Sequence, residues 1–418
     1  MYQKTTLSNG IRVVTEEIPF VNSISIGVWV VLGSSDEKEE ENGISHFIEH
    51  MLFKGTKKRT AMQIAKEIES VGGVLNAATS KEYTSYYAKV LTKDLPLAID
   101  LLSDMLLNST FNPKEIDKEK QVILQEICMV EDTPDEYIQE LLNRSFFHEH
   151  PLGYPVLGYP ETVGIIDENR MLNFFEEYYT SNRIIISVCG NIKYEEVIKR
   201  IEDKFGDLPN NNGYKAKSLP NLVSQVLIRE KELEQTHMCI GSKGLEQTNP
   251  LRYASYILNA VLGGGMSSRL FQEIREKRGL VYSVYSYMSA YFDTGLFTIY
   301  AGTDGNALKK VIKLIIKELN KLKNDALKKG QLQMAKEQLK GNLILACENI
   351  DNRMSRLAKS EIYFGEFITL EDIVNGIEGV VPEDVIQLAE EIFNKDYLSL
   401  VVLGQVKEKD FSKDILAV

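Results

Sequence analysis

The sequence is poor in cysteine and lacks a long hydrophobic run. Its cysteines are widely spaced and form no Cys-x-x-Cys pair, which favours buried free thiols in a reducing compartment; they are Cys128, Cys189, Cys239 and Cys347. The longest apolar stretch, residues 24–32, is far shorter than the roughly 18 residues of a membrane-spanning helix. Residues 1–14 contain no apolar segment typical of an export signal. We therefore expect a cytoplasmic protein without membrane spans.

The chain also lacks an excess of positive charge. It has 48 Lys and Arg residues against 60 Asp and Glu residues, which gives a net charge of −12. A nucleic-acid-binding surface needs clustered positive charge, so this balance argues against nucleic acid as a partner. With 44% hydrophobic and 26% charged residues over 418 positions, the composition is that of a globular protein. At about 150 residues per domain, the length suggests two or three domains.

A stretch rich in Pro, Asn and Gly near the midpoint, residues 208–221, is typical of a linker. We expect a first domain over 1–208, a linker over 209–222 and a second domain over 223–418. The two halves end in similar segments, residues 178–191 and 393–405. Within them Gly190 and Gly404 lie 214 residues apart, which indicates an internal duplication.

The same order of elements is expected in both halves. A strand is followed by a helix, a β-rich hairpin and long helices, predicted at 23–32, 43–53, 74–91 and 95–107 in the first half and at 236–241, 250–262, 280–301 and 307–322 in the second. The predicted fold class is α+β, with two homologous α/β-sandwich domains. Each has a mainly antiparallel sheet covered by helices.

The most specific motif is HFIEH, which contains His46, Glu49 and His50. Residues four apart lie one turn apart on a helix, so both imidazoles can bind one metal ion while Glu49 projects beside them. This is the inverted zinc motif H-x-x-E-H. The alternative is an amphipathic helix that carries two unrelated histidines.

A third metal ligand is expected from a predicted helix over 113–130, with Asn112 as its N-cap. At about 100° per residue, Glu119 and Glu126 fall inside its apolar stripe, which consists of Ile116, Val122, Ile123, Ile127 and Val130. Buried carboxylates are costly without a partner, and a metal ion or its histidine ligands would supply one. A pair of solvated glutamates at the helix edge remains the alternative.

These residues resemble the pitrilysin-type inverzincin metallopeptidases. The similarity is greatest to half-length members related to the mitochondrial processing peptidase β-subunit and its bacterial relatives. Their full-length relatives form a clamshell, of which such a chain is half. The matching runs are GISHFIEHMLFKGT (43–56), NAATSKEYTSYYAKVL (76–91), KEKQVILQEI (118–127), HPLGYPVLG (150–158) and GGGMSSRLFQEIREKRGLVYSV (263–284).

The resemblance implies an endopeptidase with one zinc ion per chain. The metal ligands would be His46, His50 and Glu126, with Glu119 as a supporting partner of the site. Glu49 would be the general base that accepts a proton from the attacking water.

Further residues of the second half match the family's pattern. Arg275 and Tyr282, seven apart, correspond to an arginine and a tyrosine that approach the substrate carbonyl, where a cation and a phenol can stabilise an oxyanion. Arg278 is the less favoured alternative, and an ordinary surface arginine with a strand tyrosine stays open. Gly264 and Gly265 belong to a loop that lacks the G-K-[ST] of a phosphate loop. The family uses a glycine-rich loop here for substrate entry, and a plain helix-terminating turn is the alternative.

Three remaining groups of residues each have a structural explanation as the alternative. Asn76 and Ala77 resemble the family's strand edge that pairs with the substrate backbone, although an ordinary core strand would look the same. The HEH run with His148 and His150 precedes a loop rich in Pro and Gly and is expected to be structural. His237 lies on a predicted strand without an acidic cluster and is expected in a core or interface.

The resemblance leaves one competing function, because the family also contains non-catalytic core and substrate-holding subunits. Those typically lose part of the zinc set, whereas all four of its residues are present here. We expect a peptide or unfolded polypeptide as substrate, enclosed in a chamber. A homodimer is expected, or a heterodimer with a related chain, and neither nucleic acid nor a membrane is expected as a partner.

Overall fold

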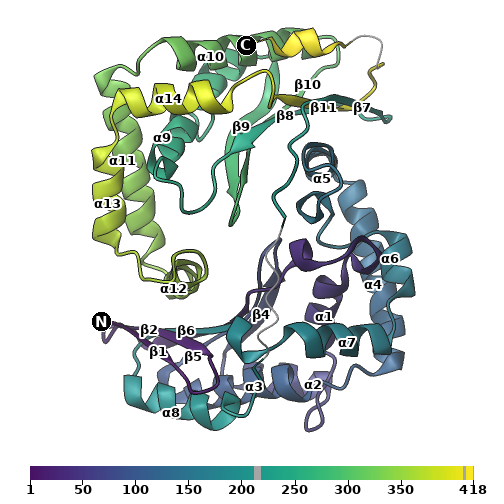
Figure 1. Ribbon diagram of the computed structural model, residues 1–418, viewed down its shortest axis with the longest axis vertical. Helices are drawn as coiled ribbons and strands as arrows, with labels where there is room; N and C mark the ends of the chain where they lie inside the picture. Colours follow the sequence, from purple (N-terminus) through teal and green to yellow (C-terminus); the bar gives the residue numbers. More distant parts are fainter. Residues whose placement is uncertain (211–217, 408–410, 418) are drawn as a thin grey trace. The chain divides into compact units, whose positions relative to one another are not determined.

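A computed structural model describes residues 1–210, 218–407 and 411–417 of the protein (Figure 1). Its elements pack into two compact units. The first consists of Met1–Cys128, Tyr154–Lys217 and Leu345–Phe367, and the second of Met129–Gly153, Ser218–Ile344 and Ile368–Val418. The linker expected at 209–222 lies partly outside the described residues, because 211–217 are not among them.

The first unit is built on a six-stranded sheet with the order β1-β2-β6-β3-β5-β4. Only β2 and β6 run parallel, and the other neighbours are antiparallel. Residues of β3 and β6 are buried on both faces of the sheet, which agrees with the apolar sequences of these two segments. The strands are β1 (Tyr2–Thr6), β2 (Arg12–Glu17), β3 (Ser23–Val30), β4 (Val74–Thr79), β5 (Thr84–Leu91) and β6 (Ile184–Gly190).

Helices cover both faces of this sheet. One face packs into the main hydrophobic core with helices α1 (Ile44–Leu52), α2 (Ala61–Ser70), α3 (Leu95–Asn108), α4 (Pro113–Glu131), α6 (Pro160–Ile165), α7 (Glu168–Tyr178) and α8 (Tyr194–Phe205). The other face carries α12 (Ile350–Phe364), a helix from late in the chain. Small side chains on this face, such as Ser25, Gly27 and Ser187, leave room for it. A Cβ on Gly27 would stand 2.7 Å from the Met354 sulfur of α12.

The second unit contains a five-stranded sheet with the order β7-β11-β8-β10-β9. Its strands are β7 (Val226–Glu230), β8 (Thr236–Gly244), β9 (Val281–Ala290), β10 (Gly295–Thr303) and β11 (Ser399–Gly404). The accompanying helices are α9 (Arg252–Leu262), α10 (Leu308–Asn324), α11 (Lys329–Ala346), α13 (Leu370–Gly379) and α14 (Pro382–Ile392). The opposite face packs against α5 (Pro134–Phe146) in a separate apolar cluster that includes Leu142, Phe146, Leu296, Val401 and Leu403.

The two sheets share one topology, which confirms the duplicated α+β fold. The order β2-β6-β3-β5-β4 corresponds to β7-β11-β8-β10-β9, and in each sheet the first of these strands is parallel to the second. The predicted strands, helices and hairpins of both halves are present at nearly the expected positions. The units differ from a simple division at the midpoint, because each sheet is covered on one face by a helix from the other half of the sequence (Figure 1).

Two details of the sequence interpretation are wrong. Val122 was expected on the buried stripe of α4, but it is exposed, because the buried stripe is narrower and runs through Ile116, Ile123 and Ile127. All four cysteines are free, yet Cys128 is exposed and only the other three are buried. Cys128 lies on α4 beside the equally exposed Met129, at a position that the apolar stripe does not reach.

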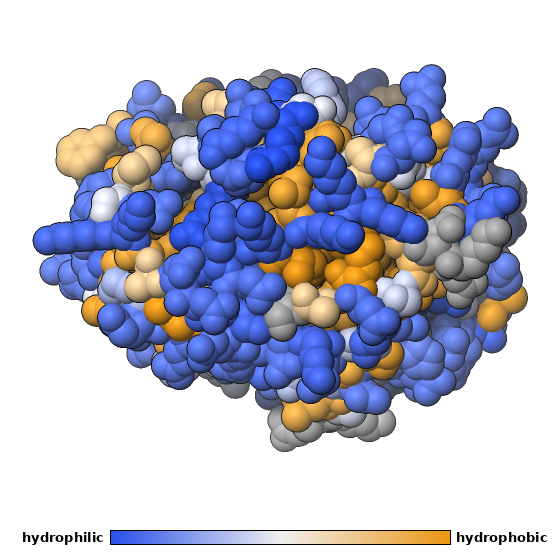
Figure 2. All heavy atoms as spheres, turned by 90° about the horizontal axis from the view of Figure 1, so that it is seen from above, coloured by the Kyte–Doolittle hydropathy of each residue, from blue (hydrophilic) through white to orange (hydrophobic). Residues whose placement is uncertain are grey.

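The surface agrees with the composition. Hydrophilic side chains predominate on the face shown in Figure 2, and hydrophobic ones show mainly in the gaps between them. None of the helices within the described ranges is both long enough and apolar enough to cross a membrane.

Candidate metal centre

Helix α1 presents the H-x-x-E-H residues on one side and anchors itself with the other. Its apolar side chains, among them Phe47, Ile48 and Met51, are buried in the core of the first unit. The rings of His46 and His50 lie on the opposite side with their centroids 4.5 Å apart, as expected for residues one turn apart.

The N-terminus of α1 is fixed by a residue outside the helix. The cap residue Gly43 has φ +96° and offers no side chain to accept the free backbone N–H groups. Instead, the buried carboxylate of Glu37 accepts hydrogen bonds from the N–H groups of Gly43 and Ser45, both at 2.8 Å, and from the Asn42 side chain at 2.9 Å. An anion at this end also complements the helix dipole. Burial outweighs these donors and raises the pKa of Glu37 to about 7.

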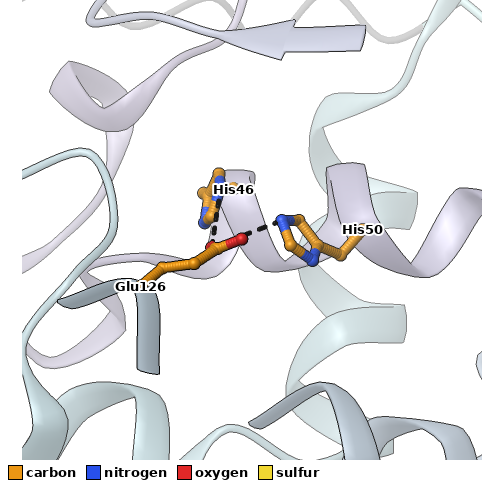
Figure 3. Close-up of side chains that lie close together, drawn as sticks. All are labelled: His46, His50 and Glu126. Atoms are coloured by element: carbon orange, nitrogen blue, oxygen red, sulfur yellow. Dashed lines mark ion pairs between the residues drawn. The ribbon is translucent and has the colours of Figure 1, made fainter. Parts of the chain in front are cut away.

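Helix α4 brings a carboxylate to the two histidines. Its first turn is capped by Asn112, whose Oδ1 accepts a hydrogen bond from the Lys114 N–H at 2.9 Å. Oε2 of Glu126 lies 3.9 Å from His46 Nε2 and 3.7 Å from His50 Nε2 (Figure 3). One donor atom from each of these three residues lies within 4.8 Å of the others.

The chemistry of this group suits a divalent transition metal such as zinc. Two imidazoles and one carboxylate are the ligand set of several catalytic zinc sites. Burial, and secondarily the charge of His50, lowers the pKa of His46 to about 3, so its ring is neutral and able to donate a lone pair. Oε2 of Glu126 and Nδ1 of His46 are buried and have no hydrogen-bond partner among the described residues. A buried carboxylate oxygen in this state calls for a cation.

Glu119, seven residues and about two helical turns before Glu126, contacts the ring of one of the two histidines. Its Oε2 lies 3.1 Å from His50 Nδ1, the ring nitrogen that faces away from Glu126. The other oxygen is bound by the ammonium of Lys54 at 2.6 Å. A carboxylate on the second nitrogen fixes the tautomer and orientation of a ligating imidazole. Glu119 is buried, as the apolar stripe predicts, whereas the side chain of Glu126 is about one-third exposed.

Glu49 is held by the edge strand of the sheet. Its carboxylate accepts a hydrogen bond from the hydroxyl of Thr79, at the end of β4, and interacts with the backbone N–H of the same residue. Burial raises the pKa of Glu49 above its ordinary value, and the Thr79 hydrogen bonds oppose this shift. The result is a carboxylate with a raised proton affinity in a fixed orientation beside the histidines.

Strand β4 is the edge strand that the sequence indicated. Among the strands of the described residues it pairs with β5 alone, which leaves its other side open. Asn76 is exposed and Ala77 is half-buried. The Ala77 N–H donates to Oδ1 of Asn76 at 2.8 Å. The same strand therefore carries the predicted peptide-pairing residues and the residue that holds Glu49.

The second unit contains the other predicted catalytic pair. Arg275 follows the glycine-rich loop, and its guanidinium lies 5.8 Å from the ring centroid of Tyr282, which is 78% exposed on β9. Arg278, the alternative arginine, is engaged by Glu273 at 2.8 Å. The structure thus groups Arg275 with Tyr282.

The remaining candidates have structural surroundings. The N–H groups of Gly263 and Gly264 both donate to the Asn259 carbonyl, so this loop terminates α9, although Gly264 remains exposed. Nε2 of His150 lies 2.9 Å from the carbonyl oxygen of Ser218, and Nδ1 accepts from the Leu152 N–H. His237 lies 2.8 Å from the Tyr300 hydroxyl. In the part of the chain that the structure describes, no histidine outside α1 joins a group of three potential metal ligands.

An H-x-x-E-H helix with a glutamate from a second helix is the arrangement of the inverted zinc-motif class of proteins. Residues 12–159 match the family described as insulinase (peptidase family M16), and residues 166–339 match the domain described as the peptidase M16 inactive domain. The chain belongs to peptidase family M16. This confirms the family resemblance drawn from the sequence.

Relatives match this chain over nearly their whole length. A Bacillus subtilis protein named uncharacterized zinc protease YmxG is 45% identical over 397 residues, which cover 95% of this chain and 97% of that protein. A Streptomyces coelicolor protein, also named as an uncharacterized zinc protease, is 39% identical over 98% of this chain and 91% of its own. The half-length form is thus shared with these relatives.

Solved structures show the same fold. The crystal structure of a protease from Helicobacter pylori matches with a TM-score of 0.90 at 23% identity, covering 97% of this chain and 99% of that one. A Pseudomonas fluorescens structure described as a peptidase M16 inactive domain matches with a TM-score of 0.91 at 20% identity, covering 97% and 98%. At these identities the comparison establishes the fold alone.

Three residues of the site were missed by the sequence interpretation. Glu37 lies in an acidic run, DEKEEE, that is typical of a solvated loop, yet it is buried under α1. Thr79 and Lys54 lie inside recognised motifs, but the motifs themselves do not show that these two residues bind carboxylates. A signal was available for Thr79 alone, since it follows Ala77 by two residues and therefore lies on the same face of the strand.

Proposed function

We propose that this protein is a zinc-dependent endopeptidase that cleaves peptides or unfolded polypeptide segments. The observation that carries the proposal is the convergence of His46, His50 and Glu126 from two helices, with their donor atoms within 4.8 Å of one another. Membership of peptidase family M16 and the zinc protease names of its relatives support the same function. A cytoplasmic location, expected from the sequence, belongs to this proposal.

In the proposed site, His46, His50 and Glu126 hold one zinc ion per chain. Zinc in such a site acts as a Lewis acid that polarises a carbonyl and makes water nucleophilic near neutral pH. The partners of the ligands are already in place, because Glu119 holds His50 through its second nitrogen and is itself bound by Lys54. This support orients the ring of His50 before a metal binds.

Glu49 acts as the general base. It accepts a proton from the attacking water and delivers it to the leaving amine as the peptide bond breaks. The raised pKa of Glu49 suits both steps, since a carboxylate of ordinary pKa accepts a proton less readily at neutral pH. The hydroxyl of Thr79 keeps the Glu49 carboxylate in position. Since Thr79 belongs to β4, the general base is attached to the strand that is proposed to bind the substrate.

Substrate recognition is proposed to occur through the backbone. An extended peptide would add to the open edge of β4 at Asn76 and Ala77, a mode that requires little side-chain sequence. The Asn76 side chain would have to release the Ala77 N–H, because this hydrogen bond occupies the donor that a peptide carbonyl would use. The exposed loop with Gly264 and Gly265 is proposed to assist substrate entry.

Arg275 and Tyr282 are proposed to stabilise the oxyanion that forms at the substrate carbonyl. We propose that they act on the zinc site of a partner chain in a dimer, which is identical or closely related. Such a dimer would enclose a chamber and would favour peptides and unfolded segments by size.

The proposal is tested by zinc determination and peptide hydrolysis on purified protein. Glu49→Gln should keep zinc and the fold but lower turnover by at least a hundredfold, because it removes only the proton acceptor. Glu126→Gln should weaken zinc retention under mild chelation, since an amide is a poorer ligand than a carboxylate. Glu131→Gln, an exposed change on the same helix, is the matched control and should alter neither.

Two results would contradict the proposal. A protein that binds no zinc and hydrolyses no peptide would be a non-catalytic subunit of the family. Near-normal turnover by Glu49→Gln would remove Glu49 as the base.

A further inference from the structure

A cavity of about 770 Å³ lies in the second unit, lined by α9, the loop that follows it and the start of α11. We call it the α9–α11 cavity. Aliphatic side chains such as Val261 and Met334 line it together with Ser267, Arg269, Glu337 and Gln338. Its size falls within the range of small-ligand pockets, roughly 300–1,000 Å³.

Arg269 is a half-buried cation without a close partner. Its guanidinium makes no hydrogen bond or ion pair with any residue that the structure describes. Burial lowers the pKa of Arg269, while Glu318 and Asp325 oppose this shift from beyond ion-pair distance. Glu318 is already bound by Lys321 at 2.6 Å. Partial removal of a charge from water without an ion pair is unfavourable, so an anion bound beside Arg269 would be stabilised.

Two uncharged donors accompany the guanidinium. The amide nitrogen of Gln338 lies 3.4 Å from the position that a Cβ on Gly265 would take. Within the described ranges, neither the Gln338 amide nor the Ser267 hydroxyl has a hydrogen-bond partner. The acidic residue of the lining, Glu337, is paired with Lys340 at 2.8 Å, so its charge is compensated. Besides Arg269, the lining therefore offers the Gln338 amide and the Ser267 hydroxyl, each of which can donate to an anion and can also accept.

We propose that the α9–α11 cavity binds the C-terminal carboxylate of a peptide. The planar fork of Arg269 matches a carboxylate, and Gln338 and Ser267 can donate to the same oxygens. The aliphatic walls at Val261 and Met334 would hold an apolar side chain of the terminal residue. Because Arg269 is a single cation without an ion pair to any described residue, it balances a monoanion better than a phosphate. The ligand class rests on the proposed peptidase function, because it takes the ligand to be a peptide.

The test measures binding of short fluorescent peptides to the full-length Glu49→Gln protein, so that cleavage does not interfere. One hexapeptide ends in leucine as the free acid, and its partner of identical sequence ends in the amide. A third peptide has an amidated end and an internal glutamate, which supplies the same carboxylate from a side chain. Inorganic phosphate and acetate serve as competitors.

The acid should bind about tenfold more tightly than the amide, the size of effect expected from hydrogen bonds to a charged group. Arg269→Met should remove this difference, whereas Arg269→Lys should keep part of it and Gln338→Ala should reduce it about threefold. Arg229→Met, at an exposed position on β7, is the control and should retain the full preference. Acetate should compete at least as well as phosphate.

Equal binding of acid and amide by the parent protein would overturn the proposal, even if Arg269→Met fails to fold. A preference that survives in folded Arg269→Met would overturn it too. Equal binding of the internal-glutamate peptide and the acid would exclude terminal recognition, and stronger competition by phosphate would exclude a carboxylate site. A wild-type protein that hydrolyses no peptide, together with an intact acid preference, would contradict only the proposed peptidase.

Discussion

Gly43, the residue before α1, offers a direct test of how the metal-binding helix is positioned. Its φ of +96° lies in the left-handed region, where a side chain is unfavourable by about 1–2 kcal/mol. In addition, a Cβ at Gly43 would stand 2.7 Å from the Leu157 carbonyl oxygen and 2.8 Å from the Gly158 Cα. These are backbone atoms, so the loop or the start of the helix must move.

Gly43→Ala should therefore lower the free energy of unfolding by about 2–5 kcal/mol, of which about 1–3 kcal/mol comes from the collision. Gly72→Ala provides the matched control. Gly72 also has a positive φ, +67°, but nothing lies within 4 Å of its added Cβ. This variant should lose only the conformational part, about 1–2 kcal/mol.

Urea unfolding of the two full-length variants would give both losses in the free energy of unfolding. A zinc titration of the same proteins would give the affinity of the metal site. Because the Gly43 N–H also donates to Glu37, a displaced helix start should weaken zinc binding in Gly43→Ala and leave it unchanged in Gly72→Ala. Equal destabilisation by the two substitutions would refute the collision argument. Strong destabilisation with unchanged zinc affinity would show that the helix start does not set the ligand positions.

Three further predictions follow from the site. Thr79→Val should lower kcat about tenfold with little change in KM or zinc content, whereas Thr79→Ser should retain activity, because the hydroxyl that holds Glu49 is kept. Since burial raises the pKa of Glu37 to about 7, its contribution to stability is full below about pH 4.5 and falls by roughly 3 kcal/mol as the pH rises to 7; thermal unfolding of Glu37→Gln should lack this component. If sites are shared between chains, mixing Glu49→Gln with Tyr282→Phe should restore about a quarter of wild-type activity after subunit exchange, and no recovery would place Tyr282 in its own chain's site or outside any site.

The sequence predicts individual helices and strands well where the spacing of side chains follows a single helical or strand period. The four-residue spacing of His46 and His50 specifies a shared helical face, and the seven-residue spacing of Glu119 and Glu126 puts both carboxylates on one side of α4. The structure adds that the two glutamates have different surroundings. The carboxylate of Glu119 contacts the Lys54 ammonium and Nδ1 of His50, whereas the carboxylate of Glu126 faces the rings of both His46 and His50.

Contacts between distant segments were beyond sequence reasoning. Glu37 precedes α1 by a loop whose composition is typical of solvent exposure, and its role depends on how that loop folds back onto Gly43 and Ser45. The pairing of each sheet with a helix of the other half has no periodic signature, because α5 and α12 are amphipathic in the same way as helices that pack locally. Such partners are chosen by tertiary packing.

The exchange of α5 and α12 has a consequence for the order of synthesis. Helix α5 leaves the ribosome before the sheet that it covers, so the apolar face around Leu296 and Leu403 has a cover as soon as it forms. Helix α12 is made late. At about 5–20 residues per second, the 174 residues from Gly190, at the end of β6, to Phe364 take roughly 9–35 seconds.

For that time one face of the first sheet stays in water on the nascent chain. This face combines small and polar residues, such as Ser25, Gly27 and Ser187, with the large apolar side chains of Trp29 and Ile185, whereas the face under α5 is rich in leucine and valine. Until α12 is made, the small and polar residues of this face limit the apolar surface that the nascent chain exposes.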